Sequence, residues 1–206
     1  MKTLMISFGF LILFFPTIIV AQQGYLDLNF EKVDTTGKTI FQWKDVGEGA
    51  MLMIDTTLTY SGKNSMYVRL KHPKDGASYY MQLPKSYYQG MRTIDVYVSV
   101  KMPNALPNAG IWCSVKKDRE YLGGASSYKA NPSSPIFPNA RFQGKDLPQM
   151  PYTWIPCHFE IKIDKDPTEV FIGISVSKDR AWFDDIKINI NGIAINDLVF
   201  QIIENE

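Results

Sequence analysis

Residues 94–100 read Ile94-Asp95-Val96-Tyr97-Val98-Ser99-Val100, so that every second residue is a branched aliphatic one. Successive side chains of a β-strand point to opposite faces, and this alternation therefore predicts a strand with one buried face. The same period of two recurs at residues 65–70, 158–163 and 170–176. Clusters of turn-forming residues separate these stretches, for example at residues 60–64 and 164–167. We therefore expect an all-β chain, folded as a two-sheet antiparallel β-sandwich.

Residues 1–21 have the composition of a signal peptide. Lys2 supplies a positive charge, residues 4–20 form an almost uninterrupted apolar run, and Ala21 ends that run with a small residue. A run of roughly 17–20 apolar residues can also span a bilayer, so an uncleaved anchor is the alternative. Pro16 and Ala21 favour cleavage before Gln22. We expect a protein exported to the periplasm or the extracellular space, with no membrane span after cleavage.

The remaining chain, residues 22–206, is long enough for a single domain with one core that needs no disulfide framework. We expect the core of this domain at about residues 25–190. Residues 129–151 are rich in Pro, Asn, Ser and Gly, and they predict a long loop that covers one face of the sandwich. The formal net charge is +1, with acidic and basic residues mixed along the chain. This mixture argues against nucleic acid as a partner.

The chain has two cysteines, Cys113 and Cys157. In an oxidising compartment they could pair if their strands were neighbours, but two cysteines make no disulfide framework. Two separate buried thiols is the interpretation we favour. Neither these cysteines nor the two histidines, His72 and His158, have the spacing of a zinc site.

Three short motifs, taken in order, resemble a known group of binding domains. They are Leu28-Asn29-Phe30-Glu31, the Tyr-Ser-Gly-Lys-Asn-Ser-Met stretch at residues 60–66, and Ala181-Trp182-Phe183-Asp184-Asp185-Ile186-Lys187-Ile188. The set resembles galactose-binding-like jelly rolls, in particular carbohydrate-binding modules of the family-four and family-nine type. It looks most like the domain that precedes erythromycin-esterase-like and other secreted enzymes of Bacteroidetes-type bacteria. The resemblance implies a jelly-roll sandwich that binds glycans.

Asp184 lies in the last of these motifs, on a stretch with the period of a strand. Counting in twos puts Trp182 and Asp184 on the same face as Ile186, Ile188 and Ile190. A carboxylate in an apolar row is costly unless it is paired or bound to a cation.

The resemblance implies a structural calcium ion as the partner of this carboxylate. Its ligands would be Asp184, Glu31 and backbone carbonyls near Gly62 or Lys63, with Asp185 as the alternative acid. The other interpretation is that Asp184 accepts hydrogen bonds from turn amides or from Lys63.

Aromatic residues alternate with core residues on several of the expected strands. If Ile111, Cys113 and Val115 point inward, Trp112 points outward, and the same counting puts Tyr97, Tyr67 and Arg69 on outward faces. Sugar rings stack on aromatic rings, and their hydroxyl groups bond to polar neighbours. We expect Trp112, assisted by Tyr97, Tyr67 and Arg69, to bind a glycan. The alternative is that residues 129–151 cover these aromatics as a second small core.

The sequence favours a non-catalytic protein. It contains no Gly-x-Ser-x-Gly elbow, no His-Glu-x-x-His motif and no phosphate-binding glycine loop. Our first hypothesis is a secreted glycan-binding module, and the alternative is a protein-interaction or structural sandwich of a surface or periplasmic assembly. A secreted hydrolase that uses Glu120 with Asp95 or Glu160 is the third and weakest.

Overall fold

Strands account for nearly all the secondary structure of the computed structural model, which describes residues 22–31, 43–45, 49–72, 76–103, 109–127, 141–142, 153–195 and 197–202. The elements are β1 (Gln22–Asp27), β2 (Lys44–Asp45), β3 (Ala50–Asp55), β4 (Ser65–Leu70), β5 (Ala77–Gln82), α1 (Lys85–Tyr88), β6 (Thr93–Lys101), β7 (Ala109–Lys117), β8 (Glu120–Ser126), β9 (Arg141–Phe142), β10 (Trp154–Lys162), β11 (Glu169–Val176), β12 (Arg180–Ile190), β13 (Ile193–Ile195) and β14 (Asp197–Ile202). The four stretches with period two coincide with β4, β6, β10 and β11.

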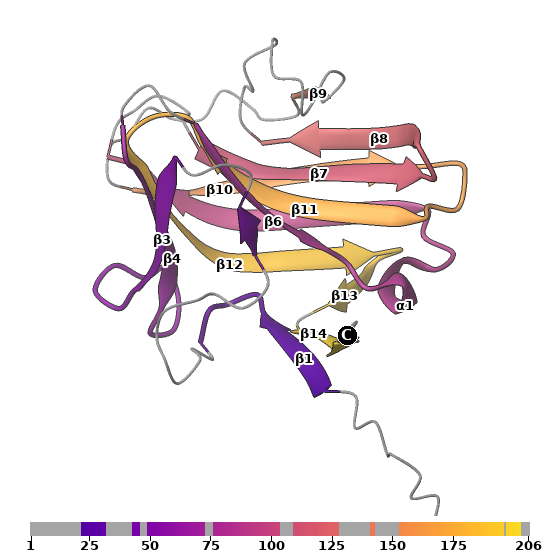
Figure 1. The fold of residues 1–206 in the computed structure, drawn as a ribbon, viewed down its shortest axis with the longest axis horizontal. Coiled ribbons are helices and arrows are strands. Elements are labelled where there is room, and N and C mark those ends of the chain that lie inside the picture. The colour runs from indigo at the N-terminus through magenta and orange to yellow at the C-terminus, as the bar shows by residue number, and fades with distance from the viewer. Residues whose placement is uncertain are drawn as a thin grey trace, which may run out of the picture.

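Most strands belong to two sheets that form two layers (Figure 1). One sheet has the order β10-β6-β12-β4-β3, with β13 paired to β12, and the other has the order β2-β5-β11-β7-β8-β9. Every pairing in them is antiparallel except that of the short β9 with β8. Strands β1 and β14 pair with each other as a separate ribbon. The predicted all-β, two-sheet sandwich is confirmed.

The core lies between the two sheets and takes every second side chain from each. Ile94, Val96, Val98 and Val100 of β6 belong to one hydrophobic cluster with the inward residues of β11, namely Val170, Ile172, Ile174 and Val176. All eight are at most 2% exposed. Burying an aliphatic side chain of this size stabilises a fold by about 1.5–3 kcal/mol. The alternation in the sequence is thus the pattern that holds the two layers together.

Strand β12 departs from strict alternation at Asp184 and Asp185. Its register with β6 shifts between Asp184 and Lys187, and Asp185 has a φ of 52°. Ala181 and Phe183 face the core before this bulge, and Ile186 and its apolar successors face it afterwards. The expectation that Trp182 and Asp184 share a face with Ile186 is therefore wrong, because a bulge adds a residue and reverses the phase of the strand.

Some sequence predictions fall on residues outside the described ranges. The predicted signal peptide, residues 1–21, is one, and the predicted loop at 129–151 is another, apart from β9 at the edge of its sheet. Among the described residues, no helix is long and apolar enough to cross a membrane. Cys113 and Cys157 are both free and buried, on strands of different sheets. The interpretation of two separate thiols is confirmed.

Candidate functional site

The sandwich has two outer faces of different composition. The outer face of the sheet that contains β5, β11 and β7 has short side chains at its centre, and we call it the serine face; its members include Ser78, Ser114, Gly173 and Ser175, with the rings of Tyr80, Trp112 and Phe171. The outer face of the other sheet has aromatic and basic side chains in cross-strand rows. We call that one the cationic face; its members include Tyr67, Arg69, Lys101, Trp154, Arg180 and Trp182.

Trp112 forms the floor of the serine face. Its neighbour across the ladder is Gly173, and a Cβ atom at that glycine would lie 2.2 Å from Cε2 and Cζ2 of the indole. The indole Nε1 donates a hydrogen bond of 3.0 Å to Ser78 Oγ, and the residue is only 4% exposed. The sequence predicted Trp112 as an exposed platform, but the residue is buried, with its ring flat against a position without a side chain.

Tyr80 and Phe171 provide the accessible rings of this face. Both are partly buried, and their ring centroids are 5.8 Å apart in an edge-on arrangement. The Tyr80 ring is also 6.4 Å from that of Trp112, and Lys116 Nζ lies 5.4 Å from the Phe171 centroid. The exposed Gln82 is the cross-strand partner of Phe171. Two rings with an ammonium and an amide beside them thus share one face.

A short chain of hydroxyl groups lies beside Trp112. Ser175 Oγ donates to Ser78 Oγ over 2.9 Å, and Ser78 Oγ donates to the Ile174 carbonyl over 3.1 Å. Both serines are less than 10% exposed. These bonds fix Ser78 as the acceptor for the indole, so the tryptophan is held from below and from its edge.

The structure does not bring the four predicted ligand residues together. Trp112 is on the serine face, whereas Tyr67, Arg69 and Tyr97 are on the cationic face, with the core between them. Alternation shows whether a side chain points inward, but it does not show to which sheet the strand belongs. Tyr80 was missed because it follows Tyr79 in the sequence, and only the register shows which of the two faces outward.

Even on the cationic face the predicted residues are spread out. Tyr67 pairs with Trp182 across the ladder, and their rings are 4.9 Å apart. Tyr97 is four residues along β6 from Lys101, the other neighbour of Trp182, which corresponds to about 13 Å. Tyr97 instead stacks on His158, with centroids 4.1 Å apart and an interplanar angle of 11°.

Asp184 and Glu31 both hold the turn between β3 and β4. Asp184 is fully buried, and its Oδ2 accepts the amides of Tyr60 at 2.7 Å and Ser61 at 3.0 Å. Glu31 Oε1 accepts the amides of Lys63 at 2.8 Å and Asn64 at 3.1 Å. Asp184 Oδ1 also accepts the amide of Asp185. Burial raises the pKa of Asp184, and the three amides partly oppose that rise.

These contacts satisfy both carboxylates without an ion, and the calcium site stays a prediction. The turn meets both carboxylates with N–H groups, whereas a hard cation needs several oxygen ligands. Asp185 forms an ion pair of 2.7 Å with Lys187 instead. No group of three or more His, Cys, Asp or Glu side chains that could hold a metal occurs among the described residues. The observed arrangement matches the alternative, in which turn amides satisfy Asp184.

The acids considered for a hydrolase lie apart. Glu120 is at the start of β8 and forms an ion pair of 2.7 Å with Lys165. Asp95 and Glu160 face each other across β6 and β10, on the other sheet. Asp95 lies 3.4 Å from His158 Nε2, and both residues are partly exposed. Glu120 therefore does not converge with either acid on a common bond.

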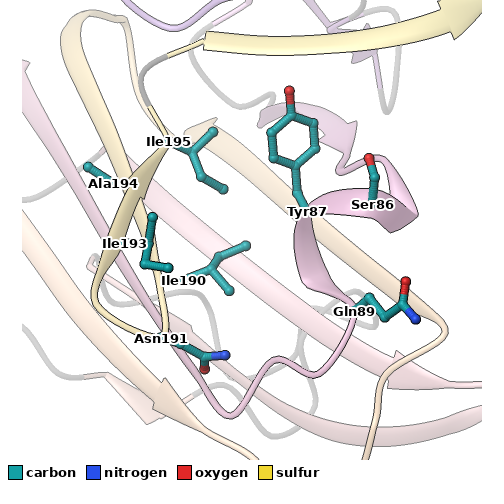
Figure 2. Close-up of a pocket in the computed structure, with 8 residues that line it drawn as sticks. All are labelled: Ser86, Tyr87, Gln89, Ile190, Asn191, Ile193, Ala194 and Ile195. Atoms are coloured by element: carbon teal, nitrogen blue, oxygen red, sulfur yellow. The ribbon is translucent and has the colours of Figure 1, made fainter.

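A pocket of about 540 Å³ lies between α1 and the hairpin of β12 and β13 (Figure 2). Ile190, Ile193, Ala194 and Ile195 line it from the hairpin, and Ser86, Tyr87 and Gln89 line it from the other side. Asn191 is at its edge, but its carboxamide accepts the amides of Arg92 and Thr93 and donates to the Gly90 carbonyl. The pocket has no charged residue in its lining, so it offers little chemistry.

Comparisons with known proteins bear on the fold. A scan against protein-family models finds no match, and neither does a search of the curated proteins. Solved structures do match. One match is a structure of carbohydrate-binding modules from the β-sandwich superfamily. It has a TM-score of 0.50 and 13% identity, covering 79% of this chain and 60% of that one.

Two further matches come from Paenibacillus barcinonensis Xyn10C. Its tandem of two family-22 modules has a TM-score of 0.50 and 10% identity, covering 84% of this chain and 46% of that one. Its first family-22 module, a xylan-binding domain, has a TM-score of 0.49 and 11% identity, covering 82% and 95%. At such low identity the likeness concerns the fold alone. The chain has the two-sheet β-sandwich fold found in carbohydrate-binding modules.

Proposed function

We propose that this protein is a non-catalytic glycan-binding protein whose ligand stacks on Tyr80 and Phe171 of the serine face. The observation that carries the proposal is the group of three rings on one face, two partly exposed and one fixed beneath, with Lys116 and Gln82 beside them. Sugar rings present C–H groups to aromatic faces, and their hydroxyl groups bond to polar side chains.

The fold adds support to this proposal. Two solved structures that match at a TM-score of 0.50 are named as carbohydrate-binding modules. One fold hosts many functions, so the site has to carry the argument. The apolar run and small residue at 4–21 support export, which would bring the protein to extracellular or periplasmic glycans.

The test is a titration of the purified protein against a panel of neutral plant and bacterial polysaccharides. We expect saturable binding to at least one class, weakened about tenfold in Phe171→Ala and in Tyr80→Ala, which corresponds to about 1.4 kcal/mol. Tyr97→Ala is the matched control, because it removes a partly exposed aromatic side chain from the opposite face. Absence of binding across the panel, or equal losses in all three variants, would contradict the proposal.

A further inference from the structure

One cross-strand row runs across the whole of the cationic face. The pairings of β3, β4, β12, β6 and β10 align Met53, Tyr67, Trp182, Lys101 and Trp154, and all five are on the side away from the core. Neighbouring strands are about 4.8 Å apart, so the row is roughly 19 Å long. Tyr60, which is 53% exposed, belongs to the turn between β3 and β4, donates its amide to Asp184 of β12 and packs edge-on against Trp154 at 5.8 Å. The row is a linear track rather than a compact patch.

Two arginines face each other in the next row. Arg69 pairs with Arg180 across the ladder of β4 and β12, and like charges at directly opposed positions destabilise a sheet. Arg180 Nε is buried and has no hydrogen-bond partner among the described residues, with Asp179 Oδ2 at 3.9 Å. No carboxylate in the described part of the chain forms an ion pair with Arg69. The pair therefore leaves positive charge uncompensated.

Cations on this face are held over aromatic rings. The Arg180 guanidinium lies 5.8 Å from the Trp182 ring, and Lys101 Nζ lies 5.9 Å from the Trp154 ring. Two carboxylates lie beside these rows, Asp55 and Asp184. Asp55 accepts the Trp182 indole N–H at 2.8 Å and the amide and hydroxyl of Thr57, and Asp184 accepts three backbone amides. Neutral hydrogen-bond donors thus satisfy both carboxylates, and neither forms an ion pair with Arg69 or Arg180.

We propose that the cationic face binds an anionic polysaccharide, with its carboxylate or sulfate groups on Arg69 and Arg180 and its sugar rings against the partly exposed Tyr67 and Trp154. A guanidinium binds such oxyanions through two parallel hydrogen bonds, and a lysine acts as a point charge. Aromatic rings and cations in neighbouring rows of one face fit a polysaccharide that carries both apolar ring faces and acidic groups. This site is separate from the glycan site proposed on the serine face, although both have polysaccharide ligands.

The experiment compares four polymers by affinity electrophoresis of the full protein. Polygalacturonate carries carboxylates, dextran sulfate carries sulfates, dextran is the neutral match, and polyglutamate is an acidic chain without sugar rings. We expect one or both anionic polysaccharides to retard the protein and dextran to have no effect. The stronger of the two shows whether the site prefers carboxylate or sulfate groups. If polyglutamate retards the protein as strongly as the best polysaccharide does, the proposal is overturned. It is also overturned if none of the four polymers retards the protein.

Variants locate the binding surface. Arg69→Ala should weaken retardation about tenfold, which corresponds to about 1.4 kcal/mol, and Arg69→Lys should restore part of it. The matched control is Lys162→Ala, which removes the same charge from an exposed side chain on a strand of the same sheet. Equal losses in the two alanine variants would overturn the assignment. Phe171→Ala should leave this retardation unchanged, so this site and the one on the serine face can fail independently.

Discussion

The two outer faces hold a buried tryptophan in opposite ways. On the serine face, Trp112 lies on a glycine and donates its indole N–H to a neutral hydroxyl. On the cationic face, Trp182 lies beside the Tyr67 ring and donates its N–H to the Asp55 carboxylate. Both are less than 10% exposed. The position of the tryptophan side chain thus depends on close packing on the serine face and on a charged hydrogen-bond acceptor on the cationic face.

This difference is the basis of the two different ligands that we propose for the faces. Tyr80 and Phe171 are the partly exposed rings beside Trp112, so the recognition that we propose there depends on shape. Positive charges and rings surround Trp182, so the binding that we propose there depends on electrostatic attraction. Salt screens this attraction at exposed positions. Variants that remove one kind of support should therefore affect one face and spare the other.

The largest effect is expected from Asp184→Ala, which removes the carboxylate that holds the turn over the cationic face. Three backbone amides lose their acceptor, two of them on the turn that carries Tyr60. We expect the free energy of unfolding to fall by about 4 kcal/mol, because three partly buried donors are left unpaired. Urea unfolding measures this loss. Glu31→Ala is the control, since it holds the same turn from an exposed position, and a greater loss there would contradict the account.

The same turn tests the calcium prediction. Amides already satisfy Asp184 and Glu31 Oε1, so we expect equal melting temperatures in calcium and in EDTA. A ligand that binds only the folded state raises the melting temperature. A rise of several degrees in calcium, lost in Asp184→Ala, would contradict our expectation and establish the ion at this position.

On the serine face, the addition of a side chain at Gly173 is expected to be strongly damaging. A Cβ atom there would overlap the rigid Trp112 ring, so the indole has to leave its place and lose its bond to Ser78. We expect Gly173→Val to cost about 3 kcal/mol in urea unfolding and to abolish binding at this face. Gly76→Ala is the matched control, because its nearest neighbour would be 3.8 Å away. Unchanged stability in Gly173→Val would mean that Trp112 does not lie flat there.

A direct comparison of the faces comes from replacing each tryptophan by phenylalanine. Trp182→Phe removes a hydrogen bond to a carboxylate and should cost about 2 kcal/mol, whereas Trp112→Phe removes one to a hydroxyl and should cost about 1 kcal/mol. Unfolding at several pH values separates them further.

The pH dependence follows from Asp55. Burial raises its pKa, but hydrogen bonds from Thr57, Trp182 and the Leu58 amide outweigh that rise and hold the pKa below the usual value. A lowered pKa contributes stability that is present above the unfolded value of about 4 and is lost as the pH falls through the folded value. The cost of Trp182→Phe should shrink in that range, and that of Trp112→Phe should stay constant. Two flat profiles would contradict the difference between the faces.

The sequence predicted the strands well because a period of two is a local property. The alternation at residues 94–100 and 170–176 needs only the rule that neighbouring side chains point to opposite sides, and β6 and β11 follow it. The turn at residues 60–64 was likewise read from its own composition.

The candidate sites could not be predicted in the same way, because they depend on which strands are neighbours. The outward direction of Trp112 and Tyr67 was counted within each strand, but their strands belong to different sheets. The bulge at Asp184 and Asp185 depends on pairing with β6 and on the turn that Asp184 holds. The opposed Arg69 and Arg180 are far apart in sequence and meet only through the register of β4 with β12.

The smallest expected effect is that of reductant on the melting temperature. It concerns the two inner faces of the sandwich, which carry one cysteine each. Burial raises the pKa of Cys113 and raises that of Cys157 to about 11, against the hydrogen bond from Ser127. At pH 8 a thiol with that pKa is ionised in only about one molecule in a thousand, and the thiolate is the reactive form. We expect no reaction with a thiol reagent in the folded protein, full reaction in urea, and the same melting temperature with and without reductant. A lower melting temperature in reductant would mean that a disulfide joins the layers. Facing sheets are about 10 Å apart, so that bond would require β7 and β10 to approach each other through the core.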